Sequence, residues 1–79
     1  MKITITYYGM LTEMAACKQE VLELEDASRL SELQSHLLNL HPSFSNIPLV
    51  FFADNRLIKQ EEKIENEKLI ECMPPFSGG

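Results

Sequence analysis

The C-terminal end of the chain contains the residues whose types and spacing predict chemistry. Its last six residues are Pro74-Pro75-Phe76-Ser77-Gly78-Gly79. Pro74 and Pro75 lack a backbone N–H, so they interrupt a strand ladder and favour a stiff, extended backbone. The two glycines add no side chain and make the tip slim. We expect this tail (74–79) to reach about 20 Å beyond the folded body and to present the Gly79 carboxylate to a narrow pocket of another protein.

The other reactive side chains predict little. Cys17 and Cys72 lie far apart and form no CxxC pair, so we expect free thiols, with Cys72 buried in a strand. His36 and His41 do not share a helix face at ligand spacing, and we expect no metal site. The chain has no Gly-rich phosphate loop, so we expect it to bind no cofactor and any ATP to be bound by a partner.

The tail needs a rigid base, and the patterns before it predict one. Residues Lys2–Tyr8 alternate, which predicts a strand with Ile3, Ile5 and Tyr7 directed inward. Gln19–Glu25 is expected to pair with it as a second, antiparallel strand. Met10–Lys18 between them is compatible with either a short helical turn or a loop.

A helix is expected from Arg29 to about Leu40. Ser28 is its expected N-cap, and the apolar stripe consists of Leu30, Leu33, Leu37 and Leu40. Pro42 prevents the helix from continuing.

The second half of the chain predicts three further strands. The expected elements are a central strand Leu49–Ala53, a tight turn Asp54-Asn55, a return strand Arg56–Lys59, a core anchor Ile64, a turn with Asn66 left-handed, and a last strand Leu69–Met73. The order β–β–α–β–β–β predicts an α+β fold in which a mixed sheet curls around one main helix.

Length and charge exclude several classes of function. Seventy-nine residues, 44% of them hydrophobic, fit one domain (1–79) with too small a core for an elaborate buried catalytic site. The net charge of −5 disfavours nucleic acid and anionic membranes as partners. We find no signal peptide or transmembrane run and expect a cytoplasmic protein.

PPxxGG behind this strand and helix pattern resembles the small, sulfur-carrying subunit of molybdopterin synthase. That subunit belongs to the ubiquitin-like β-grasp sulfur carriers, which include the thiamine sulfur carrier. The resemblance implies that an E1-like adenylating enzyme uses ATP to convert the Gly79 carboxylate into an acyl-adenylate. A sulfur donor then replaces AMP to give a thiocarboxylate. The large synthase subunit accepts the tail, and the sulfur attacks a pterin precursor in molybdenum cofactor synthesis. On this view the chain is a sulfur donor and is not catalytic alone.

The resemblance also implies roles for single residues. Gly79 carries the sulfur, Gly78 and Ser77 thread into the partner, Phe76 packs in a groove of the large subunit, and Pro74 and Pro75 form the stiff exit. Beside the tail, we expect Phe51 or Phe52, together with Met73 and Phe76, to form an exposed docking patch.

Three alternatives remain open. The chain could carry sulfur for thiamine or another synthesis, act as a ubiquitin-like modifier joined to lysines, or be an interaction domain whose tail is inert.

Overall fold

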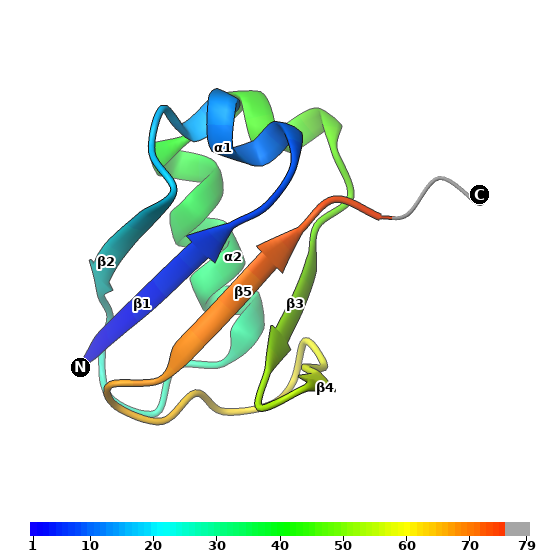
Figure 1. Cartoon of the computed structure of the whole chain (residues 1–79). Helices are drawn as coiled ribbons and strands as arrows, with labels where there is room; N and C mark the ends of the chain where they lie inside the picture. The colour runs from blue at the N-terminus through cyan, green and yellow to red at the C-terminus, as the bar shows by residue number, and fades with distance from the viewer. Residues whose placement is uncertain (76–79) are drawn as a thin grey trace.

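The computed structural model describes residues 1–75, which form a five-stranded mixed sheet with one main helix against it (Figure 1). The sheet order is β2-β1-β5-β3-β4; β1 and β5 are parallel and the other neighbours antiparallel. The elements are β1 (Lys2–Tyr7), α1 (Met10–Ala15), β2 (Gln19–Glu23), α2 (Leu30–Leu40), the 3-10 helix η1 (Pro42–Asn46), β3 (Val50–Ala53), β4 (Arg56–Leu57) and β5 (Leu69–Met73). The expected α+β arrangement is confirmed.

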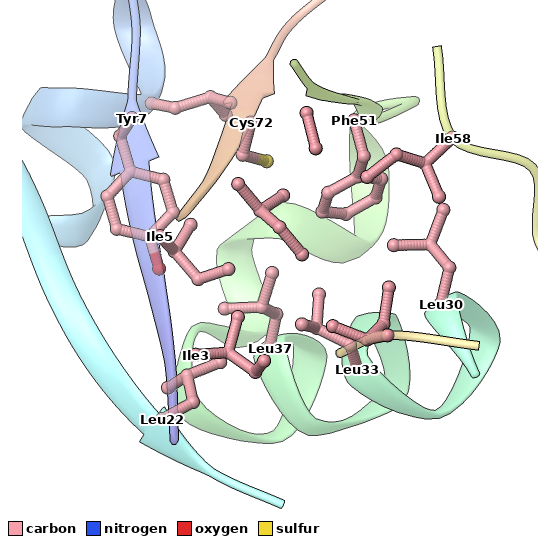
Figure 2. Packing of buried hydrophobic residues seen from close by; sticks show 14 of the residues in the cluster. Ile3, Ile5, Tyr7, Leu22, Leu30, Leu33, Leu37, Phe51, Ile58 and Cys72 are labelled. Atoms are coloured by element: carbon pink, nitrogen blue, oxygen red, sulfur yellow. The ribbon is translucent and has the colours of Figure 1, made fainter. Parts of the chain in front are cut away.

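One face of the sheet and helix α2 enclose the core, which Figure 2 shows from close by. The strand alternation predicted this face: Ile3, Ile5 and Tyr7 of β1 are buried, as are Ile70 and Cys72 of β5. From α2, Leu30, Leu33 and Leu37 are fully buried, but Leu40 is 48% exposed, so its place in the apolar stripe was wrong. Ile64 is buried as expected.

The start of α2 differs from the expectation. Arg29, in an extended conformation, is the N-cap, and its N–H donates to the Glu32 carboxylate over 2.9 Å. Ser28 instead donates its hydroxyl hydrogen to the Glu25 carbonyl over 2.7 Å. Because that hydroxyl is used one turn earlier, it does not cap the helix.

Two short helices lie at the end of the sheet from which the tail leaves. Residues Met10–Ala15 form α1, so the connection left open by the sequence is helical; Ala16 ends it with φ 60°. After α2 the chain enters η1, whose Phe44 is fully buried. From the sequence we expected only that Pro42 would end the preceding helix.

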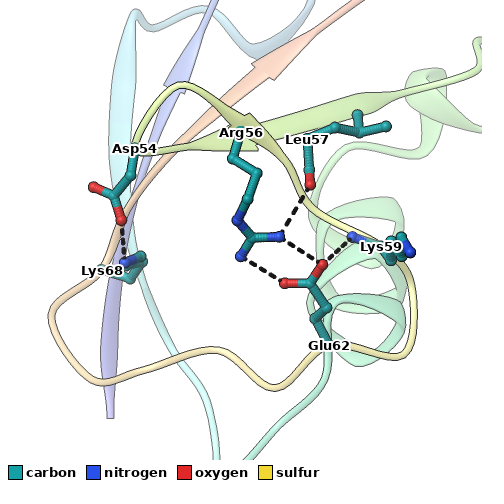
Figure 3. Close-up of polar contacts among 6 residues, drawn as sticks. All are labelled: Asp54, Arg56, Leu57, Lys59, Glu62 and Lys68. Carbon is teal, nitrogen blue, oxygen red and sulfur yellow. Dashed lines mark hydrogen bonds and ion pairs between the residues drawn. The ribbon is translucent and has the colours of Figure 1, made fainter.

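The turns and ion pairs fix the opposite end of the molecule. Asp54 and Asn55 both have positive φ, as expected for a tight turn. In the later turn Glu67, not Asn66, is left-handed, and the Asn66 amide oxygen accepts from the Lys2 N–H over 2.9 Å. Figure 3 shows the Arg56 guanidinium donating to both carboxylate oxygens of Glu62 at 2.9 and 2.8 Å.

The later strands also differ in part from the expectation. β5 occupies the middle of the sheet, whereas β3 lies second from the edge. The return strand is shorter than expected, Arg56–Leu57; beyond it Ile58 is buried, and its N–H still donates to the Phe51 carbonyl over 2.9 Å. Within residues 1–75, no helix has the length and apolar character needed to cross a bilayer.

Candidate functional site

The tail leaves from the middle strand of the sheet. β5 ends at Met73, and the next residue, Pro74, is half-buried while Pro75 is exposed. β5 is flanked by β1 on one side and β3 on the other, so its end is held by hydrogen bonds from both neighbours. Phe76, Ser77, Gly78 and Gly79, to which the sequence assigned threading, docking and sulfur transfer, lie outside the described residues. The structure therefore defines the base from which the tail starts.

The segment that follows β1 packs against the first residue of the tail. The N–H of Tyr8 donates to the Cys72 carbonyl over 3.2 Å, the last such bond between these two segments. One residue further, Gly9 lies against Pro74: a Cβ on Gly9 would be 3.5 Å from Pro74 Cγ. Gly9 has φ 58° and ψ −138°, a region that only glycine adopts readily. The start of α1 and the start of the tail are thus packed together.

The sheet face away from α2 carries most of the large exposed apolar side chains, whereas Met10 and Leu40 are exposed on the helices α1 and α2. We call it the outer sheet face and define it by Tyr8, Val50, Phe52, Leu57, Leu69 and Met73. Leu69, Leu57 and Tyr8 are 67%, 52% and 40% exposed, and Phe52 and Met73 are partly exposed. Of the two phenylalanines proposed for a docking patch, Phe51 is core and Phe52 belongs to this face. Since Met73 is the last residue before Pro74, the face continues to the tail.

A single carboxylate lies in the middle of this face. Glu71 is directly opposite Thr6 on β1 and Phe52 on β3. The Tyr8 hydroxyl donates to Glu71 Oε2 over 2.6 Å, and this bond raises the pKa of Tyr8. A phenol that donates to a carboxylate restricts the rotamers of both side chains, so Glu71 is held in place.

A second polar cluster lies inside the fold, beside the helices α1 and η1. Glu20 Oε2 accepts from the Tyr7 hydroxyl at 2.8 Å and from Cys17 Sγ at 3.5 Å, and it lies 2.7 Å from His41 Nε2. Burial alone would raise the pKa of Glu20, but the hydrogen bonds from Tyr7 and His41 outweigh it and lower that pKa. The cluster joins β1, β2 and the end of α2.

Neither thiol is an activated nucleophile. Burial raises the pKa of Cys72 to about 12, and its side chain is fully enclosed in the core. Desolvation and the neighbouring Glu20 carboxylate raise the pKa of Cys17. Among residues 1–75, no three His, Cys, Asp or Glu side chains are placed to hold a metal ion.

The cluster around Glu20 was not predicted from the sequence. The signal was there: Glu20 has the same parity in its strand as Leu22, which faces the core. A carboxylate at an inward position needs donors, and Tyr7 is at an inward position of the paired strand. His41 could not be found this way, because its place depends on how α2 ends.

Comparison with known proteins gives a clear result for the fold. No protein-family model matches the chain, and no curated protein matches its sequence. Among solved structures, a protein of Pyrococcus furiosus assigned as molybdopterin converting factor subunit 1 has a TM-score of 0.89 at 16% identity, covering 95% of this chain and 98% of that one. SAMP1 of Haloferax volcanii, a small archaeal modifier protein, has a TM-score of 0.86 at 15% identity over the whole of both chains.

A third similar structure is a complex. It holds subunits 1 and 2 of molybdopterin-converting factor from Helicobacter pylori, with a TM-score of 0.69 and 18% identity over the whole of both chains compared. These identities establish the fold alone: α+β, the ubiquitin-like β-grasp.

Proposed function

We propose that this chain is a sulfur carrier for molybdopterin synthesis, with the Gly79 carboxyl group as the carrying site. The observation that supports this most is the base of the tail. Pro74 is seated against Gly9 and Pro75 is exposed at the end of the middle strand. A tail that starts from such a fixed point loses little entropy when it enters a partner, because its first residues are already ordered. The similarity in fold to molybdopterin converting factor subunit 1 supports the same function.

The proposed chemistry takes place on partners, and atoms balance at each step. A partner E1-like enzyme joins the Gly79 carboxylate to the α-phosphate of ATP and releases pyrophosphate. A sulfur donor at the sulfide level attacks the acyl carbon, AMP leaves, and the thiocarboxylate remains. The sulfur then bonds to an electrophilic carbon of the pterin precursor, the bond from that carbon to an oxygen substituent breaks, and the oxygen leaves with the electron pair. Water cleaves the resulting acyl–sulfur bond, which leaves the sulfur on the pterin and restores the Gly79 carboxylate.

The proposed roles of the tail residues follow from this route. Gly78 and Ser77 pass through the narrow entrance of the partner's pocket, since small side chains keep the strand slim. Phe76 fills a groove of the large subunit as an apolar anchor, with Pro74 and Pro75 at its base. The solved complex of subunits 1 and 2 from Helicobacter pylori supports a large-subunit partner. The two free thiols, Cys17 and Cys72, are compatible with a protein that acts in a reducing cytoplasm.

The experiment that tests the proposal is intact mass measurement. The chain, expressed with Gly79 as its last residue, is mixed with the adenylating enzyme, ATP and a sulfide donor. The mass should rise by the difference between one sulfur and one oxygen. A matched chain with one alanine appended after Gly79 should keep its mass. No change in the first chain, with an adenylating enzyme active on its own carrier, would refute the proposal.

The similarity to a small archaeal modifier protein supports a second candidate, a modifier joined to protein lysines. This function predicts isopeptide-linked adducts of the chain in cells. A sulfur carrier predicts a noncovalent complex with a large synthase subunit, whereas a thiamine-type carrier predicts thiocarboxylate formation without that complex. Affinity purification under denaturing and native conditions separates the three.

A further inference from the structure

The Tyr8–Glu71 pair is the feature of the molecule that the proposed sulfur chemistry leaves unused. Glu71 is in the middle strand of the sheet and on its exposed face, where apolar or β-branched residues are favoured. Its strand neighbours on that face are Leu69 and Met73, and Phe52 is opposite. Glu71 is therefore bordered by apolar side chains along its own strand and on the β3 side, and by Thr6 on the β1 side.

This charge is fixed and lacks a cation of its own. Tyr8 donates to one carboxylate oxygen over 2.6 Å, and no other side-chain hydrogen bond to Glu71 is formed within residues 1–75. The ion pairs formed within residues 1–75 involve Asp26, Glu20, Glu62 and Asp54 as acids, and Glu71 is absent from them. Lys68, the cation nearest to it along the chain, is paired with Asp54 at 2.6 Å. Within residues 1–75, Glu71 thus has a neutral hydrogen-bond donor and no cationic partner.

The position of Glu71 places it inside any interface that takes up the tail. It precedes Pro74 by three residues of extended strand, about 10 Å. A stable protein interface covers about 800 Å² on each partner, which corresponds to a disc of roughly 16 Å radius. A partner centred on the tail base and lying on the outer sheet face therefore covers Glu71. Once covered, an unpaired carboxylate would be costly to desolvate.

We infer that the outer sheet face docks the large, subunit 2-like partner through an arginine or lysine of that partner, which pairs with Glu71. The inference rests on the proposed function and adds the chemistry that selects the partner. Leu69, Phe52 and Met73 exclude water around the pair, and Tyr8 orients the carboxylate toward the incoming cation. Arginine fits best, because its fork can donate to the second carboxylate oxygen while its stem covers the apolar side chains.

The experiment measures affinity for the purified subunit 2 of molybdopterin-converting factor from the same organism, by titration calorimetry at two salt concentrations. Glu71→Gln preserves shape and removes charge, so affinity should fall about tenfold or more, and its dependence on salt should weaken. Tyr8→Phe removes the hydrogen bond to the Glu71 carboxylate but keeps the carboxylate, so this variant should lose less affinity for subunit 2 than Glu71→Gln does. Glu61→Gln, on an exposed loop, makes the same change in net charge and should alter affinity less than about twofold.

A charge swap identifies the partner's cation. Glu71→Arg should abolish binding, and replacing one arginine or lysine of subunit 2 by glutamate should restore it. Thermal melts of each variant verify the fold. Equal affinity of Glu71→Gln and the parent chain overturns the inference, as does failure of the parent chain to bind subunit 2. Aggregation of Glu71→Gln at unchanged affinity also overturns it, because Glu71 would then serve only to keep the face soluble.

The outcomes for the function and for the docking are separable. If the chain acquires the thiocarboxylate but Glu71→Gln binds subunit 2 as the parent does, the docking inference fails and the sulfur carrier stands. If the mass does not change but binding depends on Glu71, the sulfur carrier fails and the docking stands.

Discussion

Gly9 and Pro74 meet where the main body of the fold passes into the tail, with 3.5 Å between Pro74 Cγ and the position of a Cβ on Gly9. That distance is an ordinary van der Waals contact, so space alone would admit a methyl group. The backbone does not, because φ 58° with ψ −138° is the mirror image of extended backbone and brings a side chain into clash. Glycine is therefore required here by the backbone conformation. A substitution that changed this conformation would shift the backbone against which Pro74 packs.

Gly9→Ala should accordingly destabilise the protein by about 1–3 kcal/mol, measured by urea unfolding. The matched variant is Ala16→Gly, at the other end of α1. Ala16 has φ 60° and ψ 26°, where glycine is favoured, so this change should be neutral or stabilise by up to about 1 kcal/mol. Equal effects of the two changes would show that the backbone of Gly9 carries no strain cost.

The Glu20 carboxylate should contribute more to stability than any exposed acid of the same strand. Glu20→Gln removes the charge that receives the Tyr7 and His41 hydrogen bonds and leaves a partly buried donor unmatched. We expect a loss of about 1–3 kcal/mol in the free energy of unfolding at neutral pH. Glu23→Gln, exposed on the same strand, should stay within about 0.5 kcal/mol. A Glu20→Gln variant as stable as Glu23→Gln would contradict a structural role for the cluster.

The stability of the fold should decrease in acid, in part because Glu62 becomes protonated. Its hydrogen bonds to the Arg56 guanidinium and the Lys59 N–H lower the pKa of Glu62 from 4.5 to about 2. Because the folded value lies below the unfolded one, this contribution is complete above pH 4.5 and is lost as the pH falls toward 2. Melting temperatures measured from pH 5 to 2 should therefore fall less steeply for Glu62→Gln than for the parent chain. Parallel curves would rule out this linkage. Since the Arg56 side chain is 64% exposed, water screens this ion pair and the difference should be small.

The strands were predictable because a period of two leaves little freedom of interpretation. Ile3 and Ile5 could be placed in the core from alternation alone, and Leu69–Met73 has the bounds that the sequence predicted. The caps and turns were not, because they depend on which hydrogen-bonding groups are already used. Ser28 is occupied by the Glu25 carbonyl, and the Asn66 amide by the Lys2 N–H, so neither adopts its expected role.

The base of the tail was predictable only in part. The prolines indicated a stiff exit, but nothing in the sequence placed Gly9, far away along the chain, beneath Pro74. The same limit applies to the outer sheet face: the run Val50-Phe51-Phe52-Ala53 could not show by itself which phenylalanine is buried. The parallel pairing of β1 with β5 and the register between β3 and β5 decide both questions.

Substitutions of Phe44 measure how much the helix η1, which was not predicted from the sequence, contributes to the stability of the fold. A 3-10 turn of five residues has too short a period for sequence patterns, yet its Phe44 is fully buried and packs edge-on against Tyr7, with ring centroids 5.6 Å apart. Phe44→Ala should cost about 3–5 kcal/mol in the free energy of unfolding. A domain of this size has about 4–12 kcal/mol in total, so the variant should be close to unfolding at 37 °C. Phe44→Leu, which keeps most of the volume, should lose much less. A loss below about 1 kcal/mol for Phe44→Ala would show that η1 is not part of the core.

The two cysteines should differ sharply in reactivity. Cys72 is fully buried, and burial raises its pKa to about 12, so iodoacetamide at pH 8 should not reach it in the native protein. Cys17 is half-buried, and its pKa is raised by desolvation and by Glu20, so it should react more slowly than a free thiol in a peptide. Intact mass should therefore show one slow adduct under native conditions and two rapid adducts in guanidinium. In Glu20→Gln the loss of the neighbouring charge should speed the Cys17 reaction. Rapid modification of both thiols in the folded chain would mean that the end of β5 opens readily, and the tail would then lack the rigid base on which its proposed delivery depends.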